Sequence, residues 1–168
     1  MKRSICLLLL PILFLGILGC QQDQPKLQAP VQFYYPRLEP TYGSSDSLIA
    51  PVPTESMSYG GDALALLNLY LSGPQDPSFT SPFPSGCRLL SLSVTDGTAY
   101  LQLDPSLAQL TGIDLTLACA CLTLTAMELT RSEAVCISAK DAVLDGAPQI
   151  LMDRSCLTLL DVYIPETT

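Results

Sequence analysis

The chain has 168 residues, of which 48% are hydrophobic, and its 8 basic and 16 acidic side chains give a formal net charge of −8. This length fits one domain with a short extension, and the acidic balance excludes the basic face that nucleic-acid binding requires. The same charge disfavours direct adhesion to anionic lipid and leaves attraction to cations or to a basic protein surface open, although a solvated acidic surface is the simpler interpretation.

Residues 1–19 contain the three regions of an export leader. Lys2 and Arg3 precede a mostly aliphatic run from Ile5 to Leu18, and the polar sequence QQDQPK follows Cys20. The run is shorter than the ~20 apolar residues that cross a bilayer, so the pattern predicts a secretory signal peptide. Its final sequence, ILGC, resembles the bacterial lipobox, in which the cysteine receives diacylglycerol and becomes the new N-terminus. The alternative is an ordinary signal peptide that happens to hold a cysteine.

Cys20 is therefore the predicted lipidation site. Each buried CH₂ of a lipid chain contributes roughly 0.8 kcal/mol, so two or three acyl chains hold a domain on a membrane without a spanning helix. Removing the 19-residue leader from 168 residues leaves 149, with 6 basic against 16 acidic side chains and a formal charge of −10. We expect residues 1–19 to be the signal peptide, residues 20–30 a lipid-anchored polar tether, and residues 31–163 a single domain at the extracytoplasmic face of the cell membrane.

The first half of the domain predicts two strands and a helix. VQFYY, Val31 to Tyr35, is aromatic and β-branched and closes at a proline, as a first strand does. SLIAPVP has strand composition, but Pro51 permits at best an edge strand. DALALLNLYL follows a Gly-Gly break with apolar residues at helical spacing, and Gly73 and Pro74 supply a helix stop.

A β-hairpin is the clearest local signal of the chain. In CRLLSLSVTDGTAYLQLD, two runs that alternate apolar and polar residues are joined by Asp96-Gly97. Such a pair specifies a two-residue type I′ turn, in which both central residues have positive φ. One face of the hairpin is expected in the core and the other in water. The predicted core positions are Leu90, Leu92, Val94, Ala99, Leu101 and Leu103.

A long helix is predicted from Asp114 to Arg131. Its leucines occupy most of the circumference, so it must be covered on nearly every side, by the sheet and by either the first helix or a partner molecule. Its charged ends suit the helix dipole. The remaining narrow stripe holds Thr116, Cys119, Thr123, Ala126 and Thr130.

The strand EAVCISA, Glu133 to Ala139, closes the recognisable pattern, with Val135 and Ile137 facing opposite to Cys136. The conformation of the segment from Gln149 onward is not fixed by its pattern. Strand, helix, hairpin, helix and strand predict an α+β fold, a small mixed sheet with a central β-hairpin packed by two helices.

Catalytic chemistry has little support in the sequence. The chain contains no histidine, which removes the commonest general base and the Cys-His and Ser-His-Asp arrangements. Cys119 and Cys121 lack the further ligands of a zinc site and diverge on a helix. Five cysteines follow Cys20, an odd number, so we expect free and mostly buried thiols, with the disulfide state left open. They are Cys87, Cys119, Cys121, Cys136 and Cys156.

Three aspartates and four tyrosines are further candidates for binding. Asp141, Asp145 and Asp153 surround a turn, but their spacing does not match the EF-hand ladder, so a solvated turn is preferred to a calcium site. Four tyrosines could stack on a glycan or a peptide, although packing is the commoner role of such side chains. These are Tyr34, Tyr35, Tyr59 and Tyr100.

Five segments of the chain together resemble the GerMN domain, the sporulation and spore germination module. They are the strand VQFYYP, the helix end LLNLYLSGP, the link and hairpin PFPSGCRLLSLSVTDGTAYLQLDPSL, the helix end LTLTAMELTRSEAV and the strand CISAKDAVLDG. The resemblance covers roughly Val31 to Leu160. It implies a βαββαβ fold of the ring-building-motif type, present here in one copy where some relatives have two, and it supplies no catalytic, cofactor-binding or metal-binding residue.

The resemblance implies a membrane-anchored lipoprotein of Gram-positive bacteria with a non-catalytic domain, which assembles or binds protein in the cell envelope during sporulation, germination or cell-wall processes. The expected partners are the membrane, through Cys20, and an envelope protein or a second copy, without nucleic acid. One alternative is a cell-wall binding protein, for glycan or peptide, or a hydrolase using paired carboxylates, which would converge roughly 5 to 10 Å apart in a cleft. A third hypothesis is a sensor of a small ligand or cation.

Overall fold

The computed structural model describes residues 30–39, 48–54 and 61–157. Cys20, the signal peptide, the tether up to residue 29 and the last residues of the expected domain, 158–163, lie outside this part of the chain. The described elements are β1 Val31–Pro36, β2 Ile49–Thr54, α1 Ala63–Leu71, β3 Leu89–Thr95, β4 Thr98–Leu103, a 3-10 turn Pro105–Gln109, α2 Gly112–Thr130, β5 Ala134–Ala139, β6 Ile150–Asp153 and α3 Arg154–Leu157.

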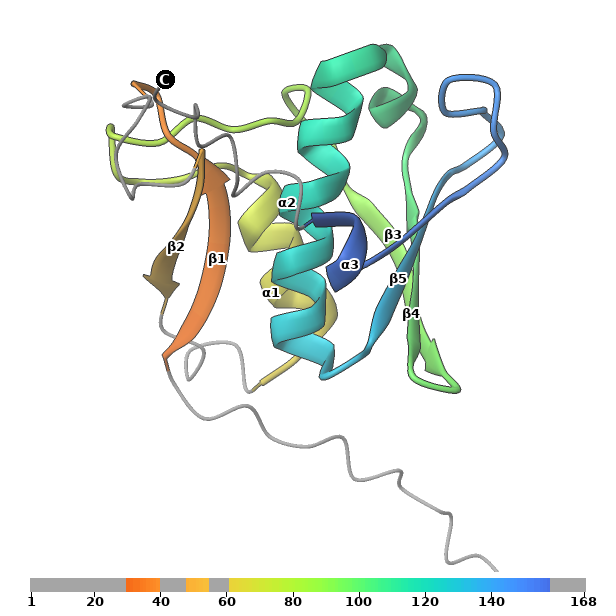
Figure 1. Ribbon diagram of the computed structural model, residues 1–168, viewed down its shortest axis with the longest axis horizontal. Helices are drawn as coiled ribbons and strands as arrows, with labels where there is room; N and C mark the ends of the chain where they lie inside the picture. The colour runs from red at the N-terminus through yellow and green to blue at the C-terminus, as the bar shows by residue number, and fades with distance from the viewer. Residues whose placement is uncertain (1–29, 40–47, 55–60, 158–168) are drawn as a thin grey trace, which may run out of the picture.

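The strands form two sheets with α2 between them. β1 and β2 pair antiparallel in one sheet, and the other has the order β3-β4-β5-β6, in which β4 and β5 are parallel and the outer pairs antiparallel. Figure 1 shows β1 on one side of α2 and the larger sheet on the other. The α+β class is confirmed. The β3–β4 hairpin lies at one side of the four-stranded mixed sheet and not at its centre, and β1 belongs to the two-stranded sheet.

The β3–β4 hairpin has the predicted turn. Asp96 and Gly97 both have positive φ, 49° and 74°, as a type I′ turn requires. The register of β3 shifts between Leu89 and Ser91, so Leu89 pairs with Leu103 and is buried, whereas Leu90 is 44% exposed. The assignments of Leu90 and Val94 to the core are therefore wrong. A bulge adds a residue that the alternation does not reveal and moves Leu90 outward, and Val94, next to the hairpin turn, is 49% exposed.

Helix α2 is covered on nearly every side, as its sequence predicts. Eleven of its residues are buried, Thr123 and Thr125 among them. It is long and apolar enough to cross a membrane, with 19 residues and a mean hydropathy of 1.5, but 61% of that stretch is buried inside the domain. Its apolar character is thus explained by packing between two sheets, and no partner molecule is needed to cover it.

The free edge of β1 is sealed by side chains of both helices. The Tyr34 amide donates to Thr125 Oγ1 of α2 at 3.0 Å, and the Tyr70 hydroxyl of α1 donates to the Tyr34 carbonyl at 2.9 Å. The Tyr35 hydroxyl in turn donates to the Tyr70 carbonyl at 2.7 Å. These bonds fix the small sheet against the helices, and Phe33, Tyr35, Tyr70 and Phe83 stack edge to face or tilted around them.

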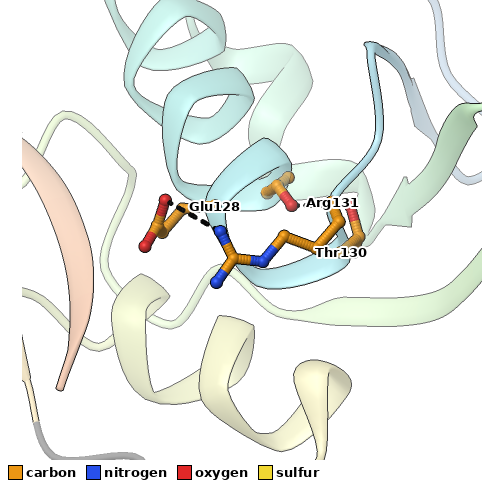
Figure 2. Close-up of polar contacts among 4 residues, drawn as sticks. Glu128, Thr130 and Arg131 are labelled. Atoms are coloured by element: carbon orange, nitrogen blue, oxygen red, sulfur yellow. Dashed lines mark hydrogen bonds and ion pairs between the residues drawn. The ribbon is translucent and has the colours of Figure 1, made fainter. Parts of the chain in front are cut away.

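The C-terminus of α2 ends on a residue with a left-handed backbone. Arg131 has φ 57°, and its amide donates to the Met127 carbonyl at 3.0 Å. Its guanidinium lies 3.9 Å from the Glu128 carboxylate in an exposed pair (Figure 2), which contributes at most about 1 kcal/mol. The Thr130 hydroxyl bonds the Ala126 carbonyl at 2.7 Å. The helix therefore stops through its own hydrogen bonds, without a glycine.

Candidate functional site

The face of the larger sheet that points away from the helices carries an exposed apolar row. Tyr100 of β4, Cys136 of β5 and Leu151 of β6 are register partners across three strands. Tyr100 is 46% and Leu151 64% exposed, whereas Cys136 between them is buried. Figure 1 shows the helices on the opposite side of this sheet. Large apolar side chains on an uncovered face are the kind of surface that protein partners use.

A cleft of about 770 Å³ opens between α1, the proline-rich link and the start of β3. Asn68 on its wall is occupied structurally: its carboxamide accepts from the Leu89 amide at 3.0 Å and donates to the Leu89 and Leu64 carbonyls at 3.3 and 3.2 Å. Ser72 and Ser81 likewise bond neighbouring backbone. The charged residue on its wall is Arg88, and no aspartate or glutamate lines it.

A second cleft of about 440 Å³ lies between the proline-rich link and α2, with Asp114 as its single acidic residue. Neither of these clefts brings two carboxylates together, which is the geometry that a glycoside hydrolase needs. Within the described residues, no group of three histidine, cysteine, aspartate or glutamate side chains is placed to hold a metal ion.

The described cysteines are free, and four of the five are buried, as expected. Burial raises the pKa of Cys119 from 9.0 to about 12 and raises that of Cys121 still further. A thiol whose thiolate is so disfavoured is a poor nucleophile and metal ligand. Cys136 also has a pKa raised by burial, and Cys156 is exposed. The helical cysteines therefore serve packing.

The three acidic residues considered for calcium do not form a cluster. The Asp145 carboxylate accepts from the Gly112 amide at 2.8 Å, so it caps the N-terminus of α2 from a distant loop. Asp153 caps α3 by accepting from the Ser155 hydroxyl and from the Ser155 and Cys156 amides, and these bonds, the one from the hydroxyl first, lower its pKa. Asp141 is exposed in a turn with φ 54°. The preference for a solvated turn over a calcium site agrees with this placement.

The tyrosines divide by position. Tyr35 is buried, and burial strongly raises its pKa. Tyr34 is half-buried, with a pKa raised by burial and by Glu128. Tyr59 lies outside the described residues. Tyr100 alone among the three described here is open to a partner.

Sequence reasoning missed two polar residues that hold the cleft region together. One is Asn68, and the other is Asp104, which accepts from the amides of Arg88 and Ser106 at 2.7 and 2.8 Å. Burial acts to raise the pKa of Asp104, but hydrogen bonds from Ser106 and Arg88 outweigh it and lower the value. An aspartate followed by proline is typical of a helix N-cap, and this local signal identifies Asp104. Asn68 has no local signal, because its partner is 21 residues away.

Comparisons with known proteins give a family and a fold. The family profile Germane, described as sporulation and spore germination, matches residues 32–145. The tandem GerMN domains of the sporulation protein GerM from Bacillus subtilis are similar with a TM-score of 0.55 and 19% identity, over 74% of this chain and 45% of that one. A proposed lipoprotein from Clostridium perfringens has a TM-score of 0.48 and 13% identity, over 82% of this chain and 96% of that one. This chain thus spans less than half of the tandem protein, whose likeness concerns the fold. No curated protein matches the chain.

Proposed function

The chain belongs to the Germane family of sporulation and spore germination domains, and from this membership we propose that it is a lipid-anchored envelope protein that works by protein contact and not by catalysis. It is held at the extracytoplasmic face of the membrane through Cys20. Its single domain assembles with an envelope protein or with a second copy, in sporulation, germination or a cell-wall process.

The observation that carries the contact function is the exposed row on the larger sheet. Tyr100 and Leu151 are accessible while the described helices α1, α2 and α3 lie on the other face, so a partner can cover the row without any rearrangement of the core. The larger cleft offers a weaker alternative, because its amide and two of its hydroxyls already serve the fold. The low thiolate character of Cys119 and Cys121 further supports a domain without a nucleophile.

The anchor is tested by replacing the predicted lipidation site. In Cys20→Ala, we expect loss of the diacylglycerol mass from the N-terminal peptide and release of the protein from the membrane fraction. A wild-type N-terminal peptide that begins at residue 1, or one that begins at Cys20 without lipid, contradicts the anchor.

The contact function is tested on the exposed row with a matched control. Leu151→Lys places a charge on the row, and Val143→Lys changes an exposed apolar side chain, 59% accessible, in a turn away from it. We expect Leu151→Lys to reduce spore yield or germination in the source bacterium, with Val143→Lys at the wild-type level and both proteins equally abundant. Equal phenotypes for the two variants argue against contact through this face.

A further inference from the structure

Strand β3 has an open outer edge. The hydrogen bonds on either side of β4 establish which residues of β3 have backbone amides and carbonyls that face this edge. On the β5 side, the Gly97 and Leu103 carbonyls of the β4 segment accept from Glu133 and Lys140 at 2.7 and 2.9 Å. Backbone groups alternate sides along a strand, so the residues of β4 between these two positions that face β3 are Thr98, Tyr100 and Gln102. Their register partners on β3 are Thr95, Ser93 and Ser91.

The amides and carbonyls of Leu92 and Val94 consequently point away from the sheet. In the described part of the chain, no strand pairs with this edge. On the other side of the bulge, the amide and the carbonyl of Leu89 are both hydrogen-bonded to the Asn68 side chain of α1. The open stretch therefore runs from Leu90 to Thr95.

This edge lacks the features by which proteins block strand addition. Natural edges carry lysine, proline or inward charges, whereas LLSLSVT, Leu89 to Thr95, has no charge and no proline. Leu90 is 44% and Val94 49% exposed. The bulge protects one end of the strand alone. Unpaired backbone beside exposed apolar side chains is the arrangement that an added strand covers.

The sequence of the edge is complementary to itself. When β3 is laid antiparallel to an identical strand with Leu92 opposite Leu92, Ser91 lies opposite Ser93 and Leu90, at the bulge, lies beside Val94. Arg88 and Asp96 lie just beyond the strand, so that each Arg88 is on the side of the partner's Asp96. Such an arrangement has the two-fold symmetry of most homodimers. The opposite charges favour this register, although an exposed ion pair adds little affinity. The acidic net charge of the whole chain opposes association elsewhere, but β3 itself is neutral.

The 770 Å³ cleft leaves space for the other copy. Arg88, Leu89 and Leu90 line it at the start of β3, and this is the end at which the partner's Asp96-Gly97 turn arrives in the antiparallel register. A convex surface there would collide with the turn. We propose that β3 is an interface for a second copy of this chain, paired antiparallel about Leu92 to join two four-stranded sheets into one. This inference goes beyond the proposed contact through the Tyr100 and Leu151 row, because it adds a second contact surface at the edge of the same sheet.

The test uses the full-length protein in its own membranes. Leu92→Cys places a thiol beside the two-fold axis, where the Cα atoms of a hydrogen-bonded antiparallel pair lie about 5.5 Å apart, a separation typical of disulfides. With a mild oxidant, we expect a homodimer on a non-reducing gel, at least tenfold above the dimer formed by the native cysteines. Val143→Cys, at an exposed position in the loop between β5 and β6, is the matched control and is expected to stay at the native level.

Two second-site changes show whether the crosslink depends on strand pairing. Val94→Lys places a charge on the edge, and Val94→Pro removes an outward amide without touching the β4 ladder; either is expected to abolish the Leu92→Cys dimer. Val143→Lys is expected to leave it intact. Circular dichroism confirms that each variant is folded.

Three results overturn the inference. One is a Leu92→Cys dimer no stronger than that of the native cysteines or of Val143→Cys. Another is a dimer that persists in Val94→Lys and Val94→Pro. The third is a crosslink from residue 92 to a different protein, in which case the contact function stands and self-pairing fails.

Discussion

Replacing Thr125 by valine tests how the two sheets are held on either side of α2. The Thr125 hydroxyl accepts from the Tyr34 amide at 3.0 Å. The side chain is fully buried, and valine has nearly the same shape, so the substitution removes this hydrogen bond without opening a cavity. It leaves the Tyr34 amide without its partner.

The expected cost follows from that unpaired group. A buried donor without a partner costs about 1–3 kcal/mol, and valine and threonine have similar helix propensities. We expect Thr125→Val to lower the free energy of unfolding by about 2 kcal/mol, with a lower urea midpoint and an unchanged m-value in denaturation followed by circular dichroism.

Thr116→Val provides the control. Thr116 lies on the same helix and its hydroxyl donates to the Gly112 carbonyl at 2.9 Å, but the side chain is exposed. Its replacement is expected to change stability by no more than about 0.5 kcal/mol. If Thr125→Val is as stable as Thr116→Val, the sealing of the β1 edge by α2 does not hold the small sheet in place.

Three further predictions concern the C-terminal end of α2, the titration of the buried tyrosines and cysteines, and the reactivity of the thiols. Arg131→Gly is expected to stabilise the protein by about 0.5–1 kcal/mol in urea denaturation, because glycine relieves the left-handed backbone at φ 57° and the lost pair with Glu128 is weak; Arg131→Ala, which keeps the strain, should not stabilise. In the folded protein, burial raises the pKa of Cys119 and Cys121 above 9.0 and that of Tyr35 and Tyr70 above 10.0. The unfolded chain therefore releases these protons at a lower pH than the folded chain, so the free energy of unfolding should be constant up to pH 9 and fall from there to about pH 12. A urea midpoint that is flat over that range contradicts the burial of these groups. Alkylation of the native protein at pH 8, mapped by mass spectrometry, should label Cys156 and spare Cys119 and Cys121, and equal labelling of all three rules out the described core.

The parts of the fold that local sequence determines were predicted. The Asp96-Gly97 turn is fixed by the need for positive φ at two adjacent residues. The burial of α2 follows from leucines spread around its circumference. Pro51 predicted an edge strand, and β2 has β1 as its single neighbour.

The parts that depend on distant contacts were not predicted. The pairing of β1 with β2 and its attachment through Thr125 join positions 91 residues apart, and no periodicity records such a contact. The bulge between Leu89 and Ser91 moves Leu90 out of the core, because Asn68 of α1 holds Leu89 in place. Asp145 resembled a possible cation ligand in the sequence, and its partner is the start of a helix 33 residues earlier.

The two sheets in the described part of the chain have four outer edges, which are treated in different ways, and the difference bears on function. The outer edge of β1 is occupied by Thr125 and Tyr70. β2 contains Pro51 and Pro53, which remove two amides that another strand would need. β6 is only four residues long and leads directly into α3.

Strand β3 departs from this pattern, since it is seven residues long, neutral and open. A sequence that blocks or shortens three edges has the means to block a fourth, for example by a lysine at Val94, whose side chain is 49% exposed. An open edge exposes a protein to unwanted pairing, so its retention beside three protected ones argues that pairing at β3 serves the function of the domain. The Val94→Lys variant therefore tests function as well as assembly: it should fold as stably as the wild type and fail where the paired form is required.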